Sequence, residues 1–268
     1  MKSLALVAIA VVMTASLHAQ WLNYPTRGVP RTADGKPNLA APAPQTSDGK
    51  PDLSGVWQLE PTACPAEGCG QADYPAAAEF RNLGAKLKGG LPYQPWAAAL
   101  VKERTEQLGK DDPVGFCKPG GAVRILTYPP YRKFIQLPDL FVILSERDVT
   151  YRQIFTDGRP LPVDPNPTFN GYSTGRWEGD ALVVQTNGLR EGTWLDRNGS
   201  PISEAAKMTE RFRRVSYGRL DIDLTIDDAK VYTRPWTITL TQKIVLDTDL
   251  LDYHCTDNER DARHMVGK

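Results

Sequence analysis

The strongest pattern in the chain is an alternation of apolar and polar residues, which begins near Arg124 and continues almost to the C-terminus. A period of two is typical of β-strands that bury one face. Segment 236–246 shows it well, with Trp236, Ile238 and Leu240 separated by threonines. Short turn sequences such as Gly179-Asp180 separate the segments and favour tight hairpins. The pattern therefore predicts an all-β domain built as an antiparallel meander.

The predicted strands follow one another with short connections, except for a few longer loops. They are 54–60, 132–137, 140–146, 149–156, 173–178, 181–187, 207–216, 220–227, 236–246 and 250–254. Because a meander protects its edge strands best by pairing the last strand with the first, we expect a closed barrel. A sandwich of two β-sheets is the alternative.

The segments outside this pattern suggest the domain organisation. Residues 1–19 have a positive start, an apolar run and small residues up to Ala19, as in a cleavable secretory signal. Residues 20–53 are an irregular arm in which Thr32–Leu39 is repeated as Thr46–Leu53, each repeat carrying turn-forming Asp-Gly. A single domain then spans 54–268. Its insertion at 61–116 contains two expected helices at 76–87 and 95–108.

Four cysteines remain after removal of the signal: Cys64, Cys69, Cys117 and Cys255. In an exported protein an even number of cysteines favours disulfides, here two bonds with three possible connectivities. Cys64–Cys69 across a local turn together with Cys117–Cys255 is the pairing we favour. A zinc site is the alternative, but the sequence has no Cys-x-x-Cys spacing. We expect no metal.

Charge and motifs exclude several functional classes. The 32 Lys and Arg residues balance 32 Asp and Glu residues, which gives no long-range attraction for nucleic acid. The sequence contains no phosphate-binding loop, nucleophile elbow or zinc-protease motif, so we expect no cofactor. No segment after the signal is long and apolar enough for an integral membrane span. Periplasmic or secreted localisation follows from the signal.

Two resemblances accompany these patterns. Gly55-Val56-Trp57 on the first strand resembles the opening of lipocalin or calycin-type barrels, whose tryptophan closes one end of the barrel. The chain as a whole resembles a widespread family of exported, functionally uncharacterised bacterial proteins. The segments that carry this resemblance are 31–37, 51–57, 154–159, 175–184 (with Gly-Arg-Trp-Glu-Gly-Asp), 209–213 and 253–258. It implies export and a compact β domain, and it assigns no activity.

Polar residues on apolar strand faces are the candidate chemical groups, because a buried charge must be paired or used. Glu146, Asp157 and Glu210 are candidate acids or bases, since a carboxyl group in an apolar barrel can have its pKa raised. If Glu210 points inward, Arg152 is its expected partner. The favoured interpretation is that these residues either face solvent or form a purely structural ion pair.

A second group of residues is predicted to contact a ligand. It contains Arg152, Arg159, Trp194 and Asp196, with Trp194 expected to be exposed at the mouth of the barrel. The leading functional hypothesis is an exported barrel that binds a small, partly apolar molecule. A metal-independent lyase, isomerase or hydrolase, and a structural envelope protein whose barrel is filled by side chains, are the alternatives.

Overall fold

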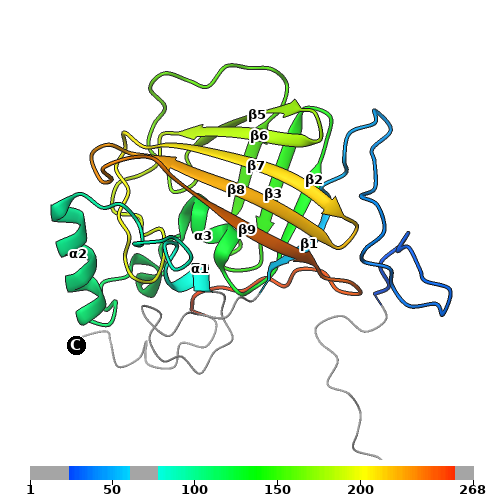
Figure 1. Cartoon of the computed structure of the whole chain (residues 1–268), viewed down its shortest axis with the longest axis horizontal. Helices are drawn as coiled ribbons and strands as arrows, with labels where there is room; N and C mark the ends of the chain where they lie inside the picture. The colour runs from blue at the N-terminus through cyan, green and yellow to red at the C-terminus, as the bar shows by residue number, and fades with distance from the viewer. Residues whose placement is uncertain (1–23, 61–77, 257–268) are drawn as a thin grey trace, which may run out of the picture.

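The computed structural model describes residues 24–60 and 78–256, and within them nine strands close into a barrel (Figure 1). Each strand pairs with the next along the chain, and the last pairs with the first. This closure confirms the predicted barrel and rules out the two-sheet sandwich. The strands are β1 Gly55–Leu59, β2 Arg132–Gln136, β3 Leu140–Ser145, β4 Tyr151–Phe155, β5 Tyr172–Glu178, β6 Ala181–Asn187, β7 Lys207–Ser216, β8 Arg219–Asp227 and β9 Trp236–Ile244.

One strand pair departs from the antiparallel meander. β4 and β5 run parallel, with Ile154 opposite Ser173 and Phe155 opposite Thr174. Parallel neighbours cannot be joined by a tight turn, because the chain must return to the end at which the first strand began. The proline-rich connection 156–171 makes this return. The sheet is therefore mixed at this one junction.

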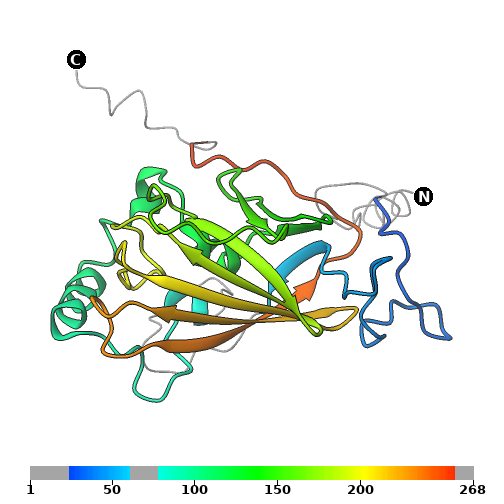
Figure 2. The same ribbon diagram turned by 90° about the horizontal axis from the view of Figure 1, so that it is seen from above.

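The last predicted strand, 250–254, is not a strand. Only Tyr253 forms an isolated bridge, with Arg147. The chain instead leaves β9 and runs back along the outside of the barrel, as the orange to red segment shows in both views (Figures 1 and 2). We call residues 245–256 the C-terminal strap. Since β9 pairs directly with β1, the barrel has no open edge there for a tenth strand to occupy.

Within the described ranges, the helices all precede β2. They are α1 Ala78–Arg81, α2 Pro95–Glu106, the short 3₁₀ helix η1 Pro113–Phe116 and α3 Gly121–Thr127. α2 confirms the predicted helix at 95–108, with proline in its first turn and positive φ at Leu108 and Gly109 just beyond its end. α3 was not predicted. Within the described residues, no helix is long and apolar enough to cross a bilayer.

Side chains fill the interior of the barrel. Phe134, Phe141 and Phe212 project from β2, β3 and β7, and their ring centroids lie 5.3 to 6.0 Å apart in edge-on contacts. The alternating apolar residues of β8 and β9 complete this core; they are Leu220, Ile222, Leu224, Ile226, Trp236, Ile238 and Leu240. The expected ligand space inside the barrel is thus occupied by the protein itself.

One end of the barrel is closed around Trp57. This fully buried side chain donates from its indole nitrogen to the Leu53 carbonyl, 3.1 Å away. The Arg214 guanidinium lies 5.0 Å from the Trp57 ring and donates to the Asp52 carbonyl. The N-terminal arm covers this end (Figure 2), where the Leu39 carbonyl accepts from the Gly218 N–H. Trp57 therefore has the position implied by the resemblance to lipocalin-type barrels.

The arm contains two equivalent turns. In each repeat a threonine hydroxyl donates to the aspartate two residues later and to the lysine carbonyl four residues later, from Thr32 in the first and Thr46 in the second. This geometry confirms the prediction of two similar turns.

α3 closes the opposite end of the barrel. Every residue of this helix is buried. The Leu126 carbonyl at its C-terminal end accepts hydrogen bonds from Arg132 on β2, at 2.6 Å, and from Gln242 on β9, at 3.0 Å. Burial lowers the pKa of Arg132 to about 9, which still leaves the guanidinium charged at neutral pH. A charged donor at carbonyls of a helix C-terminus complements the helix dipole.

Candidate functional site

A cavity of about 950 Å³ lies outside the barrel, on the far side of α3. Ligand pockets in proteins commonly measure about 300–1,000 Å³. The walls come from α1, the turn after α2, η1, α3, the β3–β4 turn, a loop at 197–198 and the C-terminal strap. The principal lining residues are Phe80, Arg81, Leu108, Asp112, Val114, Gly115, Arg124, Tyr128, Pro129, Pro130, Glu146, Arg147, Arg197, Leu251, Asp252 and Tyr253.

Glu146 attaches the strap to the barrel. One carboxylate oxygen accepts from the Leu251 N–H and the other from the Tyr131 N–H, both at 3.0 Å. The next link is made by the backbone, where the Asp148 N–H donates to the Tyr253 carbonyl at 2.8 Å. Glu146 was predicted as an acid or base. The structure places it on the cavity wall with both oxygens accepting backbone hydrogen bonds, and its catalytic role stays a prediction.

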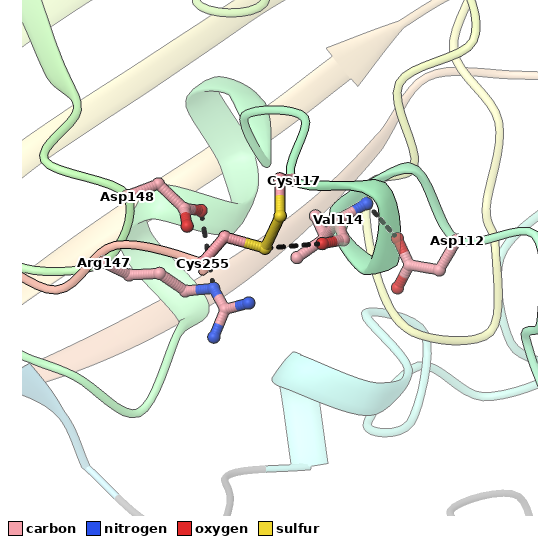
Figure 3. Close-up of a disulfide and its surroundings, with 6 residues drawn as sticks. All are labelled: Asp112, Val114, Cys117, Arg147, Asp148 and Cys255. Carbon is pink, nitrogen blue, oxygen red and sulfur yellow. Dashed lines mark hydrogen bonds and ion pairs between the residues drawn. A yellow bond between two sulfur atoms is a disulfide. The ribbon is translucent and has the colours of Figure 1, made fainter. Parts of the chain in front are cut away.

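A disulfide between Cys117 and Cys255 holds the end of the strap (Figure 3). It joins residues 138 positions apart and confirms the predicted pairing. Cys117 directly follows η1, so the bond fixes one cavity wall against another. The expected Cys64–Cys69 bond lies outside the described residues.

Arg147 is the most distinctive group on the wall. Its guanidinium centre lies 5.1 Å from the Tyr128 ring and 5.6 Å from the Tyr253 ring, so aromatic surfaces flank it. Its Nε lies 3.5 Å from a carboxylate oxygen of Asp148. Figure 3 shows the two terminal nitrogens turned away from Asp148. In the part of the chain that the structure describes, no hydrogen bond engages these two nitrogens.

A second arginine on the wall is already neutralised. Arg124 donates to both carboxylate oxygens of Asp112, at 2.7 and 3.1 Å. Burial opposes the charge on Arg124, but Tyr128 and Asp112 outweigh it and raise the pKa of the guanidinium. The same Asp112 accepts from the Val114 N–H in η1 at 3.1 Å. This pair holds η1 to α3 and leaves little charge for a ligand.

Tyr128 lies between the two arginines, since the Arg124 guanidinium is 5.3 Å from its ring. Burial raises the pKa of the phenol, although Arg124 and Arg147 act in the opposite direction. Tyr128 is therefore neutral at physiological pH and contacts both cations through its ring face. Its hydroxyl packs against Gly120, where any Cβ would overlap it.

The predicted pair of Arg152 and Glu210 forms inside the barrel. Arg152 donates to both carboxylate oxygens, and to Ser173 and Thr186, and the exposed fractions of the two charged side chains are 1% and 0%. Neither residue lines the cavity. Their burial among core side chains favours the structural interpretation, and a catalytic role for Glu210 stays a prediction.

The other predicted site residues lie elsewhere. Asp157 and Arg159 pair in an exposed turn, with the guanidinium 4.0 Å from the Phe155 ring. The expected exposure of Trp194 was wrong: the residue is 3% exposed, and the Arg104 guanidinium from α2 lies 4.5 Å from the centre of its ring. Asp196 is fully buried and accepts from the Leu83 and Ser200 N–H groups; burial raises the pKa of its carboxyl despite these bonds.

Sequence reasoning missed Arg147, Tyr128 and Tyr253. Arg147 and Asp148 fell between two predicted strands, and Tyr253 fell within the predicted strand 250–254 and within the segment 253–258 that carries the family resemblance. The proximity of Tyr253 to Cys255 was an available signal, because a disulfide to Cys117 brings the strap to the η1 wall. Comparison with models of protein families and with curated proteins finds no match for this chain.

Proposed function

We propose that this protein is an exported small-molecule-binding barrel whose ligand occupies the cavity between α3 and the C-terminal strap. The ligand is partly apolar, because prolines, aromatic rings and aliphatic side chains form much of the wall. Export is supported by the disulfide, which is typical of oxidising compartments. It also agrees with the resemblance to exported bacterial proteins.

The main support for the proposal is a cavity of about 950 Å³ that lies beside a barrel whose interior is filled by side chains. The barrel interior is occupied by three phenylalanine rings in mutual contact. The space for a ligand lies where loops from distant parts of the sequence meet. Two covalently linked segments support its walls, which reduces the ordering cost of binding.

The proposal can be tested by introducing a large side chain that fills the cavity. Gly115 lines the wall, and a Cβ at this position would meet no atom within 4 Å. A larger side chain can therefore begin here without a clash at its Cβ, and Gly115→Trp is designed to place an indole in the cavity. A panel of small organic molecules is screened by ligand-observed NMR against the wild type and this variant. Compounds that bind the wild type are expected to lose at least about tenfold in affinity in Gly115→Trp.

Ala98→Trp is the matched control, because it adds the same side chain on an exposed face of α2 away from the cavity. Its binding should equal that of the wild type. If no compound distinguishes Gly115→Trp from Ala98→Trp, the cavity is not a ligand site and the proposal fails.

A further inference from the structure

We infer that the cavity selects organic acids, with a ligand carboxylate on the two terminal nitrogens of Arg147. The inference rests on the proposed function and adds the chemical class of the ligand. The ligand would carry one carboxylate and an apolar or aromatic body.

Arg147 offers a ligand only one edge of its guanidinium group. Tyr128 and Tyr253 flank the guanidinium at 5.1 and 5.6 Å, and Asp148 lies 3.5 Å from Nε. The remaining edge carries the two terminal nitrogens, which point away from Asp148 (Figure 3). Two parallel N–H groups on a planar fork match the two oxygens of a carboxylate. The flanking rings also limit the rotation of the side chain, so less entropy is lost on binding.

The charges on the wall favour an anion over a cation. Among the residues that the structure describes, four arginines line the cavity, against three acidic residues. Two of those acids are engaged: Asp112 by Arg124, and Glu146 by two backbone N–H groups. The third, Asp252, is exposed to solvent on the strap. A cationic ligand would have to compete with these internal donors for the carboxylates. An anionic ligand can instead bind the available terminal N–H groups of Arg147.

The wall beside Arg147 fits the rest of such a ligand. Pro129 and Pro130 follow Tyr128, and Leu251 lies two residues before Tyr253 on the strap, so apolar surface continues from both rings. Phe80 from α1 adds another aromatic side chain to the wall. A flat hydrocarbon body would replace water on these surfaces, while the carboxylate exchanges its hydration for the guanidinium.

The test uses a matched acid and amide. Binding of 2-naphthoate and of 2-naphthamide is measured by isothermal titration calorimetry with the wild type, Arg147→Gln, Arg147→Lys and Arg176→Gln. Arg176 is an exposed arginine on β5 that pairs with Glu178, so its replacement controls for loss of one positive charge. The two molecules have nearly the same shape and differ in charge. Thermal melting of each variant shows whether it is folded.

We expect the wild type to bind naphthoate about 10- to 100-fold more tightly than naphthamide, as for a charge-assisted bidentate contact. Arg147→Gln should remove this difference, because naphthoate binding falls to the level of naphthamide binding. Arg147→Lys should retain part of it, since lysine keeps the charge but lacks the fork. Arg176→Gln should behave as the wild type does.

Three outcomes overturn the inference. Equal binding of acid and amide, or a preference for the acid that survives in Arg147→Gln, removes the role of Arg147. Absence of naphthoate binding also overturns it. In each case the panel screened against Gly115→Trp still decides separately whether the cavity binds ligands. Failure of the acid preference and failure of the proposed function are therefore distinguishable.

Discussion

The buried pair of Arg152 and Glu210 gives the sharpest test of the structure. Glu210→Gln keeps the shape of the side chain and removes its charge. Arg152 then retains only neutral partners, including Ser173 and Thr186 at 2.9 to 3.2 Å, in a core from which water is excluded. Leaving one charge of a buried pair uncompensated typically costs about 3–5 kcal/mol. We expect Glu210→Gln to lower the free energy of unfolding by this amount.

A double-mutant cycle separates the interaction energy between Arg152 and Glu210 from the energy of their contacts with surrounding residues. Arg152→Met with Glu210→Leu replaces both charges by apolar groups of similar size. Ser173 and Thr186 already hydrogen-bond to each other at 2.9 Å, so their hydroxyls keep a partner. We therefore expect the double variant to be much less destabilised than the sum of the single variants, with a coupling energy of about 2 kcal/mol or more.

The assay is urea denaturation followed by tryptophan fluorescence, with the slope of the transition checked for each variant. The exposed pair of Arg176 and Glu178 supplies a control cycle, for which we expect only about 0.2–1 kcal/mol. A cost below about 1 kcal/mol for Glu210→Gln, or equal coupling in the two cycles, would refute the reasoning. Glu210 would then return as a candidate acid or base.

Three further predictions concern the strap and α3. Replacing both Cys117 and Cys255 by serine should cost about 3–5 kcal/mol, because the bond closes a long loop, and denaturation midpoints measure this. Gly120→Ala should lower the melting temperature, because its Cβ would overlap the Tyr128 hydroxyl; calorimetry that shows no change contradicts this packing. Burial raises the pKa of Asp148 above its ordinary 3.8. Ionising this carboxyl group therefore costs more in the folded state than in the unfolded state, and the stability of the wild type falls as pH rises. Asp148→Asn should thus gain stability relative to the wild type between about pH 3.5 and pH 7, which denaturation at both values tests.

The barrel was predictable because its signals are local. Alternating apolar positions define strands such as β9, and Gly179-Asp180 defines the β5–β6 hairpin. Even the buried pair followed from alternation, since Glu210 lies between two inward-facing apolar residues on β7. These features depend on neighbours in sequence, and such information is present in a single chain.

α3 and the cavity were not predictable for the opposite reason. All seven residues of α3 are buried, so the helix has no polar face and its sequence lacks the helical period. The cavity wall combines residues from near position 80 to beyond position 250. The place of Arg147 between Tyr128 and Tyr253 depends on the closed barrel and on the course of the strap. No pattern within either segment records that juxtaposition.

The separation of the filled barrel from the cavity has a consequence for how this protein can diversify. Most wall residues, including Leu108, Arg197 and Asp252, lie on connecting segments that take no part in the barrel core. Substitutions there can change what is recognised while the scaffold keeps its stability. α3 is the exception, because its buried residues close the barrel while its Arg124 borders the cavity. Related chains should therefore vary in the loops and the strap, and keep the α3 sequence.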